Sequence, residues 1–353
     1  MEARPTPWRI LVAVVSASAC LLTAGCTGDS DADEPDSTSF EPVERVASPE
    51  SVTPPSGSIT ASPSGLHSIT FDAVSRSVVA LSDDSSSLLV FGTQQIDGTP
   101  RSVDLPGPAA DIVSAGDGTV LLPMQGQLVR VDLRGSDADQ GSGGRSTDFE
   151  STAVDANLLS AAQLVDGRLA AGDDSGAVHI IDPATSESRV IDGLTSVDGL
   201  AATDYGVAAL DRRQTSLTQI DLESDSLGPA LRAGSGAAKS ATDDYGRILV
   251  TDAVGGELLV FSSDDLLLRQ RFPVGAQPWA VTYDDVSDVA WISTPGTNEV
   301  VGYTLDTGIP VEVGRFPTVR APDSIDVDGE TGTLFVGSAD GGGLQRIPVG
   351  EVA

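Results

Sequence analysis

Residues 247–272 read RILVTDAVGGELLVFSSDDLLLRQRF and contain the pattern from which the fold can be inferred. Two strand-forming runs, at 247–250 and 257–261, flank a glycine pair that closes a hairpin, and residues 266–272 supply a further strand. The short runs and the glycine turn favour strands over a helix. Residues 258–261 are continuously apolar, which is typical of a strand covered on both faces of its sheet.

The same plan recurs along the chain. Each unit has a weak strand, an Asp/Gly turn, a tetrad of β-forming residues, a polar turn and a second apolar run. The tetrads are VVAL at 78–81, TVLL at 119–122, RLAA at 168–171, VAAL at 207–210, RILV at 247–250, VAWI at 289–292 and TLFV at 333–336. Their starting positions differ by 41, 49, 39, 40, 42 and 44 residues, and the one long step contains residues 135–144, an expected loop insertion.

A four-stranded sheet that repeats every 40 to 45 residues predicts a β-propeller. One such sheet cannot bury both of its faces, whereas a closed ring of sheets can. We therefore expect an all-β propeller of about seven four-stranded blades over residues 65–353. The last unit is short of its outer strand, and residues 57–61 are expected to complete it and close the ring. A solenoid or a sandwich would share the β content but would predict a different spacing.

The first residues carry an export signal. Arg4 and Arg9 precede an uncharged apolar run at 10–22, which predicts a secretory signal peptide over residues 1–25. The run is too short for a comfortable membrane span, which needs about 20 apolar residues. The sequence LTAGC at 22–26 resembles the bacterial lipobox, although Thr23 stands where Leu is more common, and the resemblance implies a lipid on Cys26. Ordinary secretion and an uncleaved anchor are the alternatives.

Residues 26–64 are polar and proline-rich, with an acidic start at 29–36. Such a composition cannot bury enough apolar surface to fold alone, so we expect a disordered tether that begins at the lipidated Cys26. The formal net charge is −32, and Lys239 is the chain's only lysine. A surface this acidic repels phosphate groups, which argues against nucleic acid and anionic lipid as partners.

At its tetrads and turns the chain resembles the YncE-type or lactonase-like bacterial propellers. The lipobox, the acidic linker and the segment LPGPAA at 105–110 together resemble the conserved β-propeller lipoproteins of mycobacteria and other actinobacteria (LppL-like). The resemblance covers nearly the whole chain, but its motifs are generic. It implies a lipoprotein of the cell envelope and no defined chemistry. The Trp-Asp ending of WD40 blades is absent.

The sequence offers few groups for catalysis, and we name no catalytic residue. It has only two histidines, His67 and His179, and neither accompanies a Gly-x-Ser-x-Gly elbow. His179 falls in an expected strand, where a structural role is favoured. Lactonase-type propellers hold a divalent cation at the channel mouth, but their ligand set cannot be placed on this sequence. The acidic segment at 326–330 is expected to be a turn, since it lacks the twelve-residue pattern of a calcium loop.

Aligning the repeats predicts a site. Counting back from each tetrad gives the residue that enters each blade, and in a propeller these residues converge at one mouth of the channel. The set, expected to bind a small ligand, is His67, Asp111, Asp198, Lys239, Trp279 and Asp323, with an ambiguous position near Ser160. A few polar groups beside an apolar wall suit a small ligand. The alternative is that these links are ordinary polar loops and that Trp279 packs between blades.

These observations predict a lipid-anchored protein on the extracytoplasmic face of the cell membrane. Its propeller would bind or scaffold an envelope protein or a small ligand without a required cofactor. The alternative is a metal-dependent, lactonase-like hydrolase with its site at the channel mouth and a divalent cation as cofactor.

Overall fold

The computed structural model describes residues 40–93, 98–134 and 149–350. These residues form strands and turns and contain no helix. Accordingly, no helix capable of spanning a membrane occurs within those three ranges. The predicted signal peptide, Cys26 and the predicted insertion at 135–144 lie outside the described residues.

Hydrogen bonding joins the described strands into six sheets. Five of them have four strands each. The first is formed by β1 (Ser58–Thr60), β26 (Leu344–Pro348), β25 (Thr333–Ser338) and β24 (Pro322–Asp328). The other four are β2 (Leu66–Asp72), β3 (Ser77–Ser82), β4 (Ser87–Gly92) and β5 (Arg101–Asp104); β12 (Gly199–Thr203), β13 (Gly206–Asp211), β14 (Ser216–Asp221) and β15 (Ser226–Arg232); β16 (Ala237–Thr242), β17 (Arg247–Asp252), β18 (Glu257–Ser262) and β19 (Leu267–Pro273); and β20 (Val281–Asp284), β21 (Val289–Thr294), β22 (Glu299–Thr304) and β23 (Val311–Pro317).

The sixth sheet has six strands. They are β6 (Val113–Ser114), β7 (Thr119–Asp132), β8 (Phe149–Gln163), β9 (Leu169–Asp173), β10 (Val178–Ile181) and β11 (Ser188–Ile191). The long strand β7 turns back on itself at Gly126, which has a φ of +81°. The two ends of β7 therefore lie together, and the N–H of Leu133 donates to the carbonyl of Gly118 at 2.9 Å.

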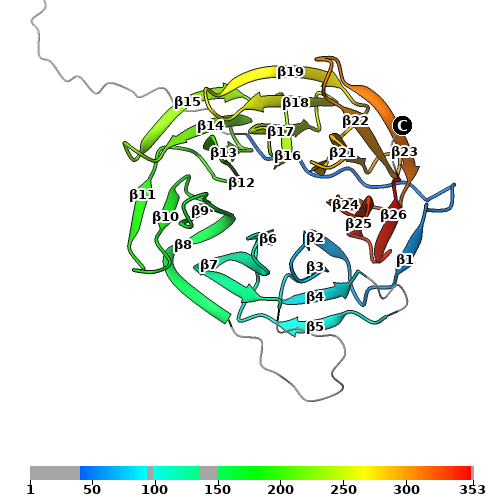
Figure 1. Cartoon of the computed structure of the whole chain (residues 1–353), viewed down its shortest axis with the longest axis horizontal. Coiled ribbons are helices and arrows are strands. Elements are labelled where there is room, and N and C mark those ends of the chain that lie inside the picture. The colour runs from blue at the N-terminus through cyan, green and yellow to red at the C-terminus, as the bar shows by residue number, and fades with distance from the viewer. Residues whose placement is uncertain (1–39, 94–97, 135–148, 351–353) are drawn as a thin grey trace, which may run out of the picture. The chain divides into compact units, whose positions relative to one another are not determined.

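The sheets stand in a ring, and an inner strand of each faces the centre (Figure 1). Around the ring, β2 lies beside β24 and β6, β12 lies beside β8 and β16, and β20 lies beside β16 and β24. This arrangement is a β-propeller, which confirms the predicted fold class. Each tetrad lies on the strand that follows an inner strand, namely β3, β7, β9, β13, β17, β21 or β25, and the tetrad side chains are almost all buried.

The expected count of about seven four-stranded blades is wrong, since there are six sheets and one has six strands. The difference arises at β8. Residues 149–153 and Asn157 of this strand pair with β7, and residues 158–163 pair with β9, with a register shift between Leu158 and Ser160. The repeats at 119–122 and 168–171 therefore share one sheet. Residues 149–163 contain no Gly or Pro that would end the strand, which also explains the ambiguous register near Ser160.

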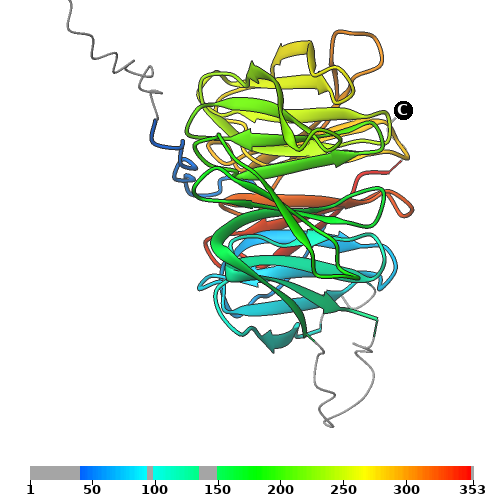
Figure 2. The same cartoon turned by 90° about the vertical axis from the view of Figure 1, so that its left-hand side faces the viewer.

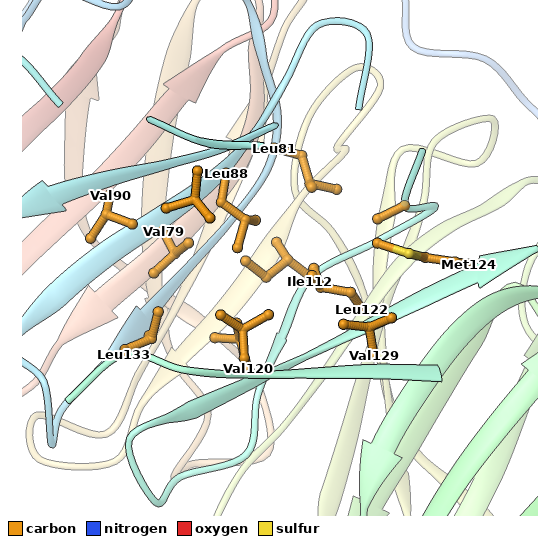
Figure 3. Close-up of a cluster of buried hydrophobic side chains, with 13 residues drawn as sticks. Val79, Leu81, Leu88, Val90, Ile112, Val120, Leu122, Met124, Val129 and Leu133 are labelled. Carbon is orange, nitrogen blue, oxygen red and sulfur yellow. The ribbon is translucent and has the colours of Figure 1, made fainter. Parts of the chain in front are cut away.

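Neighbouring sheets pack through aliphatic side chains. Between the sheet of β3 and β4 and the sheet of β7, Leu81 and Leu88 lie against Val120 and Leu122, and Ile112 fills the space between them (Figure 3). Each of these side chains is at most 4% exposed. Full burial of an aliphatic side chain contributes about 1.5–3 kcal/mol, so these interfaces supply much of the driving force for folding.

The ring closes through β1. This strand pairs antiparallel with β26, from Ser58 opposite Arg346 to Thr60 opposite Leu344, as predicted for residues 57–61. The buried amide of Gln345 secures the junction. Its Nε2 donates to the carbonyls of Ser56 (2.7 Å) and Pro317 (3.1 Å), and its Oε1 accepts the N–H of Val319 (2.7 Å).

We predict that Gln345→Leu lowers the urea midpoint of unfolding. Leucine has a similar volume but removes three hydrogen bonds to backbone groups, at about 1–3 kcal/mol for each group that then stays dry without a partner. The carbonyl of Pro317 keeps the N–H of Ser56 at 2.9 Å, so the other two groups carry most of the expected loss. The matched control is Gln125→Leu, because Gln125 is exposed and should change stability by less than about 0.5 kcal/mol. Equal midpoints for the two variants would show that the Gln345 amide does not hold the closure.

Candidate functional site

The inner strands begin at one end of the central cavity, which we call the channel mouth. The cavity has a volume of about 410 Å³ and is lined by residues of every inner strand. Four of the six predicted site residues line it: Asp111, Asp198, Lys239 and Asp323. The repeat alignment therefore brings together side chains that are far apart in the sequence.

Two of the mouth carboxylates are held by local hydrogen bonds. Asp111 accepts the hydroxyl of Ser68 at 2.6 Å and the N–H of Ile112 at 2.9 Å. Asp198 accepts the hydroxyl of Ser196 and, at 2.8 Å, the N–H of Arg212. Such bonds fix the orientation of a carboxylate. The mouth thus presents carboxylate oxygens in fixed positions.

Lys239 differs from these residues. It stands on β16, and its backbone N–H donates to the hydroxyl of Thr251 at 3.2 Å. No salt bridge to its ammonium group occurs within the described residues, although Lys239 lines the same cavity as the three aspartates. An ammonium group carries three donors, so Lys239 is available to a ligand.

His67 lies at the edge of the mouth rather than in the cavity lining. Its Nε2 lies 2.8 Å from Oδ1 of Asp83, and its Nδ1 lies 3.8 Å from Oδ2 of Asp323. Asp323 raises the pKa of His67 to about 9, with a further contribution from Asp83, while partial burial opposes the shift. His67 is therefore a cation at neutral pH and neutralises part of the carboxylate charge.

Trp279 is placed differently. Its side chain is buried, with 7% exposure, and packs in a hydrophobic cluster with Ala280 and Trp291. It is absent from the cavity lining, and the guanidinium of Arg212 lies over its ring at 5.6 Å. Trp279 thus packs beneath the residues of the mouth. Its contact with a ligand stays a prediction.

The mouth also receives Arg45, which sequence reasoning missed. Its Nε lies 2.8 Å from Oδ1 of Asp323, and both side chains are largely buried. Arg45 belongs to residues 40–57, which run along one face of the ring (Figure 2). We call these residues the strap. Their composition is that of the predicted tether, and nothing in the local sequence indicates where they bind.

The strap is held by specific polar contacts. The hydroxyl of Ser48 donates to the carbonyl of Pro295 at 2.8 Å, and Nδ2 of Asn298 donates to the carbonyl of Pro49 at 2.9 Å. The guanidinium of Arg212 donates to the carbonyl of Val43. This part of the segment predicted as a tether thus lies against the ring, while residues 26–39 are outside the described residues.

Asp326 is the notable acid inside the channel. It lies on β24 rather than in the turn expected for residues 326–330, because the strand continues to Asp328. Its carboxylate accepts the N–H of Phe71 at 2.7 Å and the hydroxyl of Thr282 at 3.1 Å. Enclosure by protein raises its pKa. These hydrogen bonds join β24 to the neighbouring inner strands β2 and β20, so the carboxylate has a structural role.

The geometry offers no metal centre in the part of the chain that the structure describes. Within these ranges, no three His, Cys, Asp or Glu side chains gather in a way that could hold a metal ion. The mouth carboxylates do not fit the lactonase-type cation, and we derive no step through one. His179 is 9% exposed, and its Nε2 lies 2.8 Å from Oδ2 of Asp173. Oδ1 of the same carboxylate accepts two backbone N–H groups of its own turn.

No protein-family model and no curated protein sequence matches the chain. Solved structures do match it. A chain of the Kuenenia stuttgartiensis hydrazine synthase aligns with a TM-score of 0.66 at 12% identity, over 80% of this chain and 95% of that one. U3-55K aligns with a TM-score of 0.64 at 8% identity, over 81% and 96%. They share the β-propeller fold with this chain. At these identities the likeness shows the fold alone.

The His67 ion pairs give a pH prediction. Because the pKa of His67 is raised above the value of about 6.5 expected for unfolded His, the pairs stabilise the fold fully below pH 6.5. That contribution is lost as the pH rises toward 9. In NMR titrations, the His67 ring, assigned with His67→Gln, should titrate near pH 9, and Asp323→Asn should lower the midpoint more than Asp83→Asn. A midpoint near 6.5 in the wild type would contradict the ion pairs.

Proposed function

We propose that this protein is a lipid-anchored propeller on the extracytoplasmic face of the cell membrane and that it binds a small ligand or an envelope protein at the channel mouth. The β-propeller fold supports a binding or scaffolding role in general. Function must be argued from the site, however, since one fold serves many activities.

The observation that carries the binding role is Lys239. A cation with no salt-bridge partner among the described residues lines a cavity of about 410 Å³ together with the carboxylates of Asp111, Asp198 and Asp323. Donors and acceptors converge there on one concave surface, which is the usual character of a small-ligand site. A polar ligand with both an acidic and a basic or hydroxyl group would satisfy both kinds of side chain.

The anchor rests on the sequence. The basic start, the apolar run at 10–22 and LTAGC at 22–26 are the features that an exported lipoprotein requires. With the acidic linker and the segment at 105–110, they also support a relationship to the actinobacterial propeller lipoproteins (LppL-like), which we include in the proposal. The net charge of −32 argues against nucleic acid as a partner.

The anchor predicts how the full chain partitions. In an actinobacterial host, the wild type should enter the detergent phase of a Triton X-114 extraction and incorporate labelled palmitate. Cys26→Ser should remain in the aqueous phase or keep its signal peptide, without label. Cys20→Ser is the matched control, because it removes the other cysteine six residues earlier and should leave anchoring unchanged. Palmitate label on Cys26→Ser as well as on Cys20→Ser would rule out the lipid on Cys26. Absence of label from both the wild type and Cys20→Ser would rule it out too.

The mouth predicts a second measurement, native mass spectrometry of full-length protein purified gently from membranes. The wild type should carry a bound small molecule. Lys239→Ala should lose it, because the described cavity lining then has no cationic side chain to meet an acidic group of the ligand. Arg232→Ala is the control, since Arg232 is exposed on the outer strand β15. The same adduct on Lys239→Ala and on the wild type would remove the channel mouth as the binding site.

A further inference from the structure

A second and larger cavity lies at the opposite end of the inner strands. It has a volume of about 680 Å³, and three of the chain's four tyrosines, Tyr205, Tyr245 and Tyr283, line it. We call it the tyrosine pocket. Tyr205 and Tyr245 follow β12 and β16, whereas the mouth residues Asp198 and Lys239 lie at the start of these strands. The tyrosine pocket therefore lies at the far end of these strands from the mouth residues, and Tyr283 is the one described residue that lines both the pocket and the central cavity.

Two repeats place a tyrosine at the same position. Residues 203–206 read TDYG and residues 243–246 read DDYG, and each forms the turn after an inner strand. The ring of Tyr205 lies directly on Gly246, where an added Cβ would come within 2.4 Å of Cδ2 of Tyr205. Tyr205 is 60% exposed and Tyr245 is 63% exposed. Most of each side chain is thus accessible, on adjacent sheets, while Gly246 covers part of the Tyr205 ring and Arg247 lies over the Tyr245 ring.

The position that an organic cation would take between two aromatic rings is already filled. The guanidinium of Arg247 lies 5.1 Å from the ring centre of Tyr245 and 5.0 Å from that of Tyr283. It also donates to the hydroxyl of Tyr283 at 2.7 Å and pairs with the buried Asp243. A cationic ligand would therefore be repelled by the Arg247 guanidinium, which already occupies the position of strongest cation–π attraction.

The rim of the pocket carries both donors and acceptors. Arg269 donates to the hydroxyl of Ser262 at 3.1 Å and forms no salt bridge with any described residue. Asp264, Asp288 and Asp306 supply carboxylates around it. Three acids on an already acidic protein disfavour a polyanionic ligand. The remaining chemistry is that of a neutral molecule with an apolar face and a polar edge.

We propose that the tyrosine pocket binds a neutral carbohydrate. A pyranose ring has C–H groups on its face, which pack on the electron-rich faces of Tyr205 and Tyr245, and hydroxyl groups on its edge, which reach Arg269 and the rim carboxylates. The volume of about 680 Å³ lies within the range of small-molecule pockets, about 300–1,000 Å³. The site is independent of the proposed function of the channel mouth.

The test uses three neutral probes, maltotriose, cellotriose and N,N′,N″-triacetylchitotriose, with saturation-transfer NMR and calorimetry on the full chain. At least one should bind the wild type. Tyr205→Ala and Tyr245→Ala should each weaken that binding by about fivefold or more, because a stacking face is lost. Tyr205→Phe and Tyr245→Phe should stay within about threefold, because the ring is kept.

Two controls keep the result interpretable. Both tyrosines are mostly exposed, so the alanine variants should melt at nearly the wild-type temperature, and Lys239→Ala should bind the sugar normally. No binding of any probe at about 10 mM overturns the proposal, as does binding that the alanine variants retain in full. If instead the wild type captures a protein partner that the alanine variants lose, with no sugar binding, the pocket is a protein-docking surface and the carbohydrate proposal is wrong.

Discussion

Burial of both faces of every sheet is the constraint on which this structure depends. Strands such as β17 and β21 are nearly inaccessible and carry an apolar run, at 248–250 and 289–292, so each sheet needs a neighbour on either side. Only a closed ring satisfies that need for all sheets at once. The pairing of β1 with β26 therefore stabilises far more than one sheet edge, because it determines whether the first and last sheets have neighbours at all.

Buried aspartates make the ring rigid where the channel mouth forms. Asp252 ends β17 with no exposed surface and accepts N–H groups of Ser235, Gly236 and Gly255, which joins its hairpin to the link that enters the sheet. Asp211 does the same for Thr195 and Ser196. Several N–H donors offset the cost of burying each carboxylate. The links beside Asp198 and Lys239 are thereby fixed, and a site built on them is preorganised.

The repeat was predictable because its signal is local. Short β-forming tetrads bounded by Gly and Asp turns indicate strands, and their regular spacing indicates the ring. Counting back from the tetrads then located Asp111, Asp198, Lys239 and Asp323 at one cavity. The count of sheets failed at residues 149–163, because the pairing of one strand with two partners depends on tertiary contacts. The burial of Trp279 and the docking of Arg45 on Asp323 depend on them too. The tyrosine pocket had a sequence signal, the repeated Asp-Tyr-Gly turn at 204–206 and 244–246, which becomes informative once the two turns are known to be neighbours.

The ring's closing sheet sets the order in which the domain can be completed. Thr60 and Arg346, whose side chains are hydrogen-bonded, lie 286 residues apart in the sequence. A chain made from its N-terminus holds β1 long before β26 exists, so final closure follows synthesis of almost the entire domain. Until then the unfinished ring exposes strand edges that can pair with other chains. A translation product that stops before Leu344 keeps those edges open for its lifetime, which makes incomplete copies the species most exposed to aggregation and proteolysis.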